Sequence, residues 1–235
     1  MKYVKCFETI SERTAALSNA DDDILHYTDE DDKAGVYEDP FNGHEYVDLG
    51  VTYNGNKLLF AKCNVGASTE TGYGNYYAWG ETTTKSDYSW STYRWGTSDA
   101  LTKYNSTDQK VTLDPEDDPV RVNMGGQWRS PADAELQALL SQTTNAWVTD
   151  YNGSGVNGCV FTGTNGNTMF VPAAGYRSGM SFFLVGSYVR WWSSSFDGVG
   201  SVDGRGLYFK GSDCYMYSGY RYNGFSARGV VSVEN

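Results

Sequence analysis

The chain has 235 residues, with 27 glycines, 19 tyrosines and 7 tryptophans, a composition that argues against a helical bundle and favours short strands and many turns. Its net charge of −11 argues against nucleic acid as a partner, because binding a phosphate backbone needs clustered Lys and Arg. No stretch approaches the roughly 20 apolar residues of a membrane span, and residues 1–20 lack the apolar core of a signal peptide. We therefore expect no membrane insertion.

The N-terminal region is expected to form a segment of its own. A capping-box spacing predicts a short helix over residues 10–18. The acidic stretch 21–32 lacks the glycine and the ligand spacing of a calcium-binding loop, so we interpret it as a solvated connector. A boundary near Asn42 then divides the chain into residues 1–43 and a domain of residues 44–235.

The domain is predicted to begin with two short strands. Alternating apolar residues over 46–51 and the apolar run 58–60 indicate strands, and Asn54, Gly55 and Asn56 indicate the turn between them.

The clearest helix is predicted directly after Arg129. Ser130 is positioned to cap it, Pro131 suits its first position, and the carboxylate of Asp133 would meet the exposed amides of the first turn. Three leucines then share one apolar face, and the helix should end near Ser141.

After this helix the chain returns to strands interrupted by glycine. They are predicted over residues 158–161, 168–171, 190–193, 207–209, 214–217 and 225–230. One firm helix among many short strands indicates an α+β fold.

A series of short strings carries a family resemblance. They are HEYVDLG (44–50), AKCNVGA (61–67), YYAWGE (76–81), WRSP (128–131), VPAAGYR (171–177), WSSS (192–195) and GFSAR (224–228). In this order they resemble the variable proteins of diversity-generating retroelements. That family includes the "major paralogous domain" proteins of gut bacteria, in the formylglycine-generating-enzyme-like branch of the C-type lectin fold.

The resemblance implies both a fold and a history for the chain. The fold would be C-type-lectin-like, with short twisted antiparallel strands, one or two helices and long irregular loops. A retroelement would rewrite adenine-containing codons in a variable region of about residues 187–224. The N-terminal segment is similar to the leading segments of phage structural proteins, which implies binding to phage tail proteins. The protein would then be located in the virion, or in the cytoplasm before assembly.

The residues themselves indicate a binding face in the same region. Segment 207–217 alternates apolar and tyrosine side chains around a turn at residues 211–213, so Tyr215 and Tyr217 should face outward together. Its Tyr, Gly and Ser content is typical of antibody loops. The candidate ligand-binding residues are Tyr188, Arg190, Asp197, Val199, Asp203, Arg205, Asp213, Tyr215, Tyr217, Tyr220, Tyr222 and Asn223.

Neighbouring residues are interpreted as scaffold. Trp191 and Trp192 should be buried, with the hydroxyls of residues 193–195 as hydrogen-bond partners for their indole N–H groups. Arg228 is predicted to bind the backbone or to form a structural ion pair.

No catalytic constellation emerges from the sequence. Cys159 and Cys214 lie in unrelated strings without a Cys-X-X-Cys spacing, and His26 and His44 are the only histidines. The acidic loop 114–118 is interpreted as solvated surface rather than as glycosidase carboxylates or a calcium site. We therefore expect no catalytic residues, no metal and no cofactor.

Two functions remain open at this point. The first is a receptor-binding or adhesion protein, not an enzyme, that recognises a host cell-surface protein or glycan. The alternative is an enzyme or maturation factor that retains the formylglycine-generating-enzyme-like fold. A neighbouring reverse transcriptase gene and template repeat would distinguish them.

Overall fold

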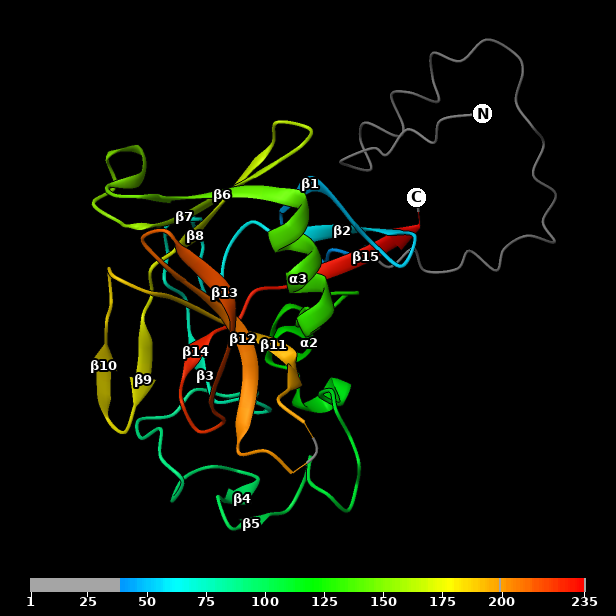
Figure 1. Ribbon diagram of the computed structural model, residues 1–235, viewed down its shortest axis with the longest axis vertical. Helices are drawn as coiled ribbons and strands as arrows, with labels where there is room; N and C mark the ends of the chain where they lie inside the picture. Colours follow the sequence, from blue (N-terminus) through cyan, green and yellow to red (C-terminus); the bar gives the residue numbers. More distant parts are fainter. Residues whose placement is uncertain (1–38, 199, 235) are drawn as a thin grey trace, which may run out of the picture. The chain divides into compact units, whose positions relative to one another are not determined.

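The fold is built from several small sheets rather than one large one. The computed structural model describes residues 39–198 and 200–234. Within these ranges, strands β1 to β15 are accompanied by two α-helices, α2 and α3 (Figure 1). The domain is therefore α+β and rich in strands, as the sequence predicts. The helix expected over residues 10–18 and the acidic connector lie outside the described residues.

A three-stranded sheet joins the first and last strands of the domain. Strand β1 (Tyr46–Tyr53) turns at Asn54 and Gly55, both with positive φ, into β2 (Asn56–Ala61), which confirms the predicted hairpin. The other edge of β2 pairs with β15 (Val230–Glu234). Figure 1 shows β2 in cyan beside β15 in red.

Residues 39–43, which precede the expected boundary, pack against the same domain. The carbonyl oxygen of Pro40 accepts a hydrogen bond from the Gln127 amide at 2.7 Å, and the Asn42 side chain donates to the Met124 carbonyl. The folded unit therefore includes Asp39 and the residues that follow it.

A five-stranded sheet carries the C-terminal part of the chain, in the order β13–β12–β11–β14–β3. Its members are β3 (Tyr76–Tyr77), β11 (Val189–Phe196), β12 (Asp203–Lys210), β13 (Asp213–Tyr220) and β14 (Phe225–Ser226). Strands β11, β12 and β13 form an antiparallel meander, and β14 runs parallel to β11. The strands predicted within β11, β12 and β13 are confirmed.

The prediction of a single strand over residues 225–230 is wrong. Strand β14 ends at Ser226, and β15 belongs to the other sheet. Between them Arg228 is fully buried, with Nε donating to the Asn64 side chain and Nη1 to the Phe170 carbonyl, both at 2.8 Å. The chain crosses from one sheet to the other here, which an apolar run does not reveal.

The remaining strands form smaller units. They are the sheet of β6 (Thr143–Val148), β7 (Gly158–Gly163) and β8 (Thr168–Pro172), the hairpin of β9 (Tyr176–Ser178) and β10 (Ser181–Phe183), and the hairpin of β4 (Gly96–Thr97) and β5 (Ala100–Leu101). The strands predicted within β7 and β8 are confirmed. β6, β9 and β10 were not predicted.

The predicted helix is present, but it begins later than expected. Helix α3 (Asp133–Gln142) starts after Ala132, whose amide donates to the Glu135 side chain at 2.8 Å. The prediction that Ser130 caps this helix is wrong. Its amide and hydroxyl both donate to Asp118 instead.

Asp118 also caps the short helix α2 (Pro119–Met124), which was not predicted. Single-turn 3₁₀ helices are η2 (Pro115–Asp117) and η3 (Tyr151–Gly153). No helix in the described ranges is long and apolar enough to cross a membrane.

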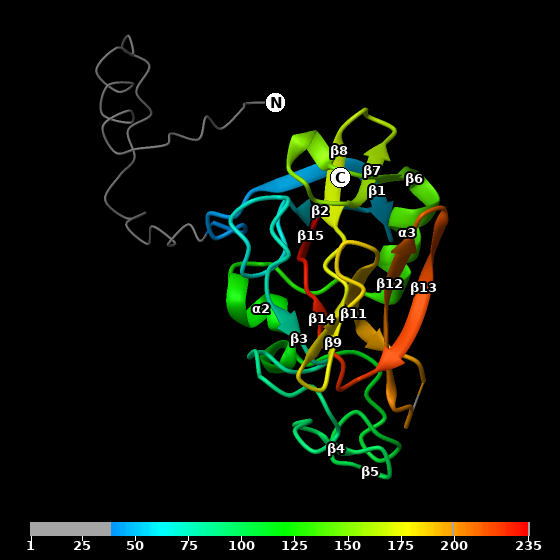
Figure 2. The ribbon, with the colours of Figure 1, turned by 90° about the vertical axis from the view of Figure 1, so that its left-hand side faces the viewer.

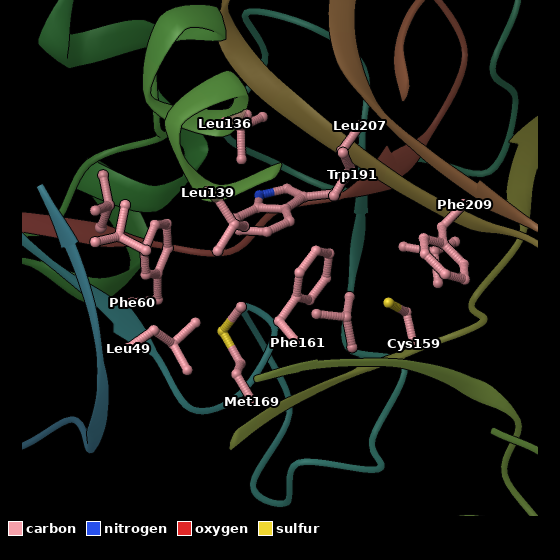
Figure 3. Packing of buried hydrophobic residues seen from close by; sticks show 14 of the residues in the cluster. Leu49, Phe60, Leu136, Leu139, Cys159, Phe161, Met169, Trp191, Leu207 and Phe209 are labelled. Carbon is pink, nitrogen blue, oxygen red and sulfur yellow. The ribbon is translucent and has the colours of Figure 1, made fainter. Parts of the chain in front are cut away.

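The main core lies between α3, the terminal sheet, the sheet of β6 to β8 and one face of the five-stranded sheet. Figure 3 shows its packing, with Leu49, Phe60, Leu136, Leu139, Cys159, Phe161, Met169, Trp191, Leu207 and Phe209. The other face of the five-stranded sheet is covered at one end by a second cluster, formed by Trp79, Tyr104, Trp192, Phe196 and Phe225. This sheet therefore has two apolar sides over part of its length.

Trp191 and Trp192 are scaffold residues, as interpreted from the sequence, and are 1% and 2% exposed. Their hydrogen-bond partners differ from the expectation. The indole N–H groups donate to the backbone carbonyls of Arg228 and Tyr77, not to the neighbouring serine hydroxyls. The two rings point to opposite faces of β11, so they pack in different clusters.

We predict that Trp192→Ala lowers the free energy of unfolding by about 3–5 kcal/mol, because it leaves a cavity beside Phe225. The two rings are stacked with their centres 3.8 Å apart. Chemical denaturation measures the effect. Tyr215→Ala, at an exposed position, is the control and should change stability by about 0.5 kcal/mol or less. Equal losses in the two variants would contradict this assignment.

Candidate functional site

The β12–β13 hairpin separates apolar and tyrosine side chains onto opposite faces. Leu207 and Phe209 lie in the main core, and Cys214 and Met216 of β13 pack against that core. Tyr208 pairs with Tyr215 across the strands and lies on the other face, together with Tyr217. The predicted alternation is therefore confirmed, although Tyr215, at 48%, is the only one of these three tyrosines that is widely exposed.

We define the tyrosine face as Tyr176, Tyr188, Arg190, Tyr208, Tyr215 and Tyr217. The rings form a connected group, with Tyr208 centred 4.7 Å from Tyr215 and 5.4 Å from Tyr188. These side chains come from β9, β11, β12 and β13 and from the residue before β11. In Figure 2 strands β11, β12 and β13 lie beside the β9–β10 hairpin.

Arg190 lies at the centre of the tyrosine face. Its guanidinium carbon is 3.8 Å from the centre of the Tyr217 ring and 4.9 Å from that of Tyr208. The rings of Tyr176 and Tyr188 lie 5.4 and 5.9 Å away. At this range each ring attracts the cation through its negative face, so the rings hold the guanidinium in place.

Lys210 adds a second positive charge at the edge of this face, 5.0 Å from the centre of the Tyr188 ring. Hydrogen bonding to Lys210 lowers the pKa of the Tyr188 hydroxyl. Burial, together with hydrogen bonding to Tyr188, raises the pKa of Tyr208 to about 12. The buried hydroxyl of Tyr208 is therefore protonated at neutral pH and can take part in hydrogen bonding.

Asp197 and Arg205 are not part of the tyrosine face. Arg205 points to the same side of β12 as Leu207 and binds Asp133, the first residue of α3, at 2.9 Å. It also donates to the Ser218 hydroxyl, which in turn donates to Asp197. This network ties the sheet to the start of α3, so a structural role accounts for both residues.

Tyr220 and Tyr222 form a second aromatic group with Trp90. The two tyrosine rings are stacked with centres 5.4 Å apart, and Tyr222 lies 5.1 Å from Trp90. Tyr220 is 50% exposed, whereas Tyr222 is half-buried against the cluster around Tyr88. Tyr222 therefore faces outward only in part.

The other candidate residues are dispersed. Asp213 is exposed beside the turn of the β12–β13 hairpin, whereas Asp203 and Asn223 are half-buried. Val199 lies outside the described residues. The structure thus brings Tyr188, Arg190, Tyr215 and Tyr217 together, and places the remaining described candidates elsewhere.

An exposed apolar loop beside the tyrosine face was not predicted. It covers residues 180–185 and includes Met180, 78% exposed, and Phe182, 57% exposed. Phe183 stacks on Tyr176 at 5.4 Å, which makes the loop continuous with the tyrosine face. The apolar run that follows Gly179 and includes β10 was the signal, because a contiguous exposed apolar patch marks a contact site.

The described cysteines are buried or half-buried thiols. Cys159 and Cys214 both pack in or against the main core, as the inward position of Cys214 predicted. Burial raises the pKa of Cys159, and it raises the pKa of Cys214 to about 12. Burial also raises the pKa of Cys63. These thiols are therefore protonated at neutral pH, a state of low nucleophilicity.

The acidic loop is not simply solvated surface, as we had interpreted it. The carboxylates of Asp114, Glu116 and Asp117 gather within 4.8 Å of one another. The Lys103 ammonium lies among them, 2.6 Å from Asp114 and 2.5 Å from Asp117, which is 1% exposed. A lysine thus supplies positive charge where three carboxylates could otherwise hold a cation.

Comparison of the chain with protein-family models, with curated proteins and with solved structures finds no match. The functional argument therefore depends on the residues and their geometry.

We predict that Lys103→Met lowers the free energy of unfolding by about 1–3 kcal/mol at neutral pH, because buried carboxylate oxygens lose their charged donor. Hydrogen bonding to Lys103 and Lys110 lowers the pKa of Asp114 below its ordinary value of 3.8. A carboxyl group with a lowered pKa stabilises the fold above pH 3.8 and loses this effect as the pH falls through its folded-state pKa. The difference between variant and wild type should therefore shrink below about pH 4. Denaturation at several pH values tests this dependence, with Lys62→Met as the control, because Lys62 pairs with the exposed Glu45 outside this cluster.

We also predict that the melting temperature is unchanged in EDTA, because the Lys103 ammonium already lies among the three carboxylates and offsets part of their charge. Thermal melts with and without chelator measure this. A fall of many degrees would contradict the prediction, since a metal that binds only the native state stabilises it.

Proposed function

We propose that residues 44–235 form a C-type-lectin-like ligand-binding domain of a receptor-binding or adhesion protein. The fold is supported by terminal strands joined in one sheet, two helices and a long stretch of few strands between β3 and α2. The resemblance of the short sequence strings supports the same branch of the fold. The ligand would be a host cell-surface protein or glycan.

One observation carries the proposal. Alternate residues of β11, β12 and β13 face opposite sides of the sheet, and the two sides have different roles. Trp191, Leu207 and Met216 pack in or against the core, whereas Arg190, Tyr208 and Tyr215 form the tyrosine face. Side chains on that face can change without altering the packing of the main core, although Tyr176 and Tyr217 also pack against the second cluster around Trp192. Tyr and Arg are also the residues that most often dominate binding energy.

The same division suits diversification by a retroelement. A mutated Asn codon ending in pyrimidine cannot encode Lys, Glu, Gln, Met or Trp. In residues 187–224 these types occur only at Trp191, Trp192, Lys210 and Met216. The first two are buried and Met216 packs against the core, so most of the unreachable types are scaffold residues.

We predict that replacing Tyr215 and Tyr188 with serine weakens ligand binding while the fold persists. Truncated hot-spot tyrosines typically cost about 2 kcal/mol or more of binding, whereas surface changes cost about 0.5 kcal/mol of stability each. Pull-down from host-cell surface extracts, set beside thermal melts, measures both effects. The matched control is Tyr46→Ser, an exposed tyrosine on β1. Equal binding by all three proteins would contradict the proposal.

Sequencing the locus tests the diversification. We expect a reverse transcriptase gene and a near-identical template repeat that covers the codons of about residues 187–224. A locus without either would remove the support for a variable protein.

A further inference from the structure

Arg190 is a buried cation that has no polar partner among the residues the structure describes. The residue is only 9% exposed, and its Nε is buried without a hydrogen-bond acceptor. Within the described ranges it forms no ion pair and donates no hydrogen bond, and its contacts are with aromatic rings. Attraction to rings offsets part of the desolvation cost, but rings do not replace an oxygen acceptor for the buried Nε–H.

The other buried arginines are treated differently by the fold. Arg221 donates to the Tyr104 carbonyl at 2.9 Å, and Arg228 binds both Asn64 and Phe170. Each of these guanidinium groups has at least one oxygen acceptor supplied by the chain, although Arg221 Nε and Nη1 and Arg228 Nη2 are also buried without a partner. Arg190 has none, and it is the one that lies in the candidate binding face.

We propose that Arg190 receives the carboxylate of an acidic side chain from a protein partner, which inserts between the tyrosine rings. This inference rests on the proposed ligand-binding function and names the chemistry of its ligand. A carboxylate matches the fork of N–H donors of a guanidinium, and the ion pair would be partly shielded from water.

The depth of Arg190 favours a slender acidic side chain over an acidic sugar. Tyr215 is 48% exposed, whereas Arg190 is 9% exposed, so the arginine lies deeper in the tyrosine face. A glutamate or aspartate carries its carboxylate at the end of a narrow chain that can pass between the rings. The carboxylate of a sugar acid is attached directly to a wide ring, so it reaches a recessed cation less well.

The exposed apolar loop also favours a protein partner. Tyr176 connects the two features, because its ring lies 5.4 Å from the Arg190 guanidinium and is stacked on Phe183 at 5.4 Å. Leu184 and Val185 add further exposed apolar surface. A protein can supply apolar side chains to this loop beside its acidic residue, whereas a glycan is polar over most of its surface.

Charge limits the partner to a local acidic group. The chain as a whole carries −11, so a long acidic run would be repelled at a distance. The positive charges of Arg190 and Lys210 act over a small area, the tyrosine face. A single carboxylate flanked by apolar residues therefore fits best.

The test is an NMR titration of the full chain with isotope-labelled arginine and tyrosine, in which the Arg190 Nε–H signal is assigned by its loss in Arg190→Gln. The probes are acetyl-Leu-Glu-Leu-amide, its Gln counterpart, glucuronate and glucose at constant ionic strength. We expect the Glu peptide to shift the Arg190 signal saturably and to bind about tenfold or more tighter than the Gln peptide, as a charged hydrogen-bonded pair would. Arg190→Gln should lose this preference, whereas Arg94→Gln, at an exposed arginine, should keep it.

Other outcomes would overturn the inference. Tighter binding of glucuronate than of the Glu peptide would identify an acidic glycan instead. An Arg190 signal that no carboxylate shifts would make Arg190 a purely structural cation, even if both peptides shift the tyrosine signals. In that case the face still binds ligands, and the proposed function stands without the acidic contact. If Arg190→Gln does not fold, the signal is assigned by its loss in Arg190→Lys, which keeps the positive charge, and the titration of the unmutated chain decides.

Discussion

The position of the C-terminal strand depends on one buried side chain. Burial lowers the pKa of Arg228 to about 10, so the guanidinium is still charged at neutral pH although it is fully buried. Its charge is met by the Asn64 side chain and the Phe170 carbonyl rather than by a carboxylate. The Arg228 carbonyl in turn accepts the indole N–H of Trp191. These bonds fix Trp191 toward the core and therefore direct Arg190, its neighbour on β11, to the opposite face.

The tyrosine face is thus a consequence of how the core is anchored. Because side chains alternate along a strand, fixing one inward residue on β11 determines the direction of the rest. Ladder pairing then extends this choice to β12 and β13, where Tyr208 lies opposite Tyr215. The rings on this face contact one another and Arg190 and are not part of the main core of Leu207 and Phe209, although Tyr176 and Tyr217 also pack against the second cluster around Trp192. Changes on one side are therefore expected to add to changes on the other with little coupling.

Local chemistry was readable from the sequence, whereas contacts between distant segments were not. The β1–β2 hairpin, α3 and the alternation of the β12–β13 hairpin follow from turn residues and periodicity. Ser130 satisfied every local rule for a helix cap, yet Asp118 competes for its hydroxyl. Arg205 and Asp197 matched the composition of a binding loop, but a network with Asp133 on another element uses them. The absence of an oxygen acceptor beside Arg190 among the described residues could not be predicted either, because it depends on which distant segments fold against it.

Residues 39–43 have a consequence for mechanical load on the domain. β1 enters its hairpin at the end away from the turn, so tension applied there would open the β1–β2 hydrogen bonds one pair at a time. Before reaching β1, however, such tension meets the bond of Pro40 to Gln127, the bond of Asn42 to Met124 at the end of α2, and the stacking of Phe41 on Tyr46. These contacts must break first. Under such tension residues 39–43 would detach before any β1–β2 hydrogen bond breaks, so the terminal sheet would stay intact while the domain is pulled against a bound surface.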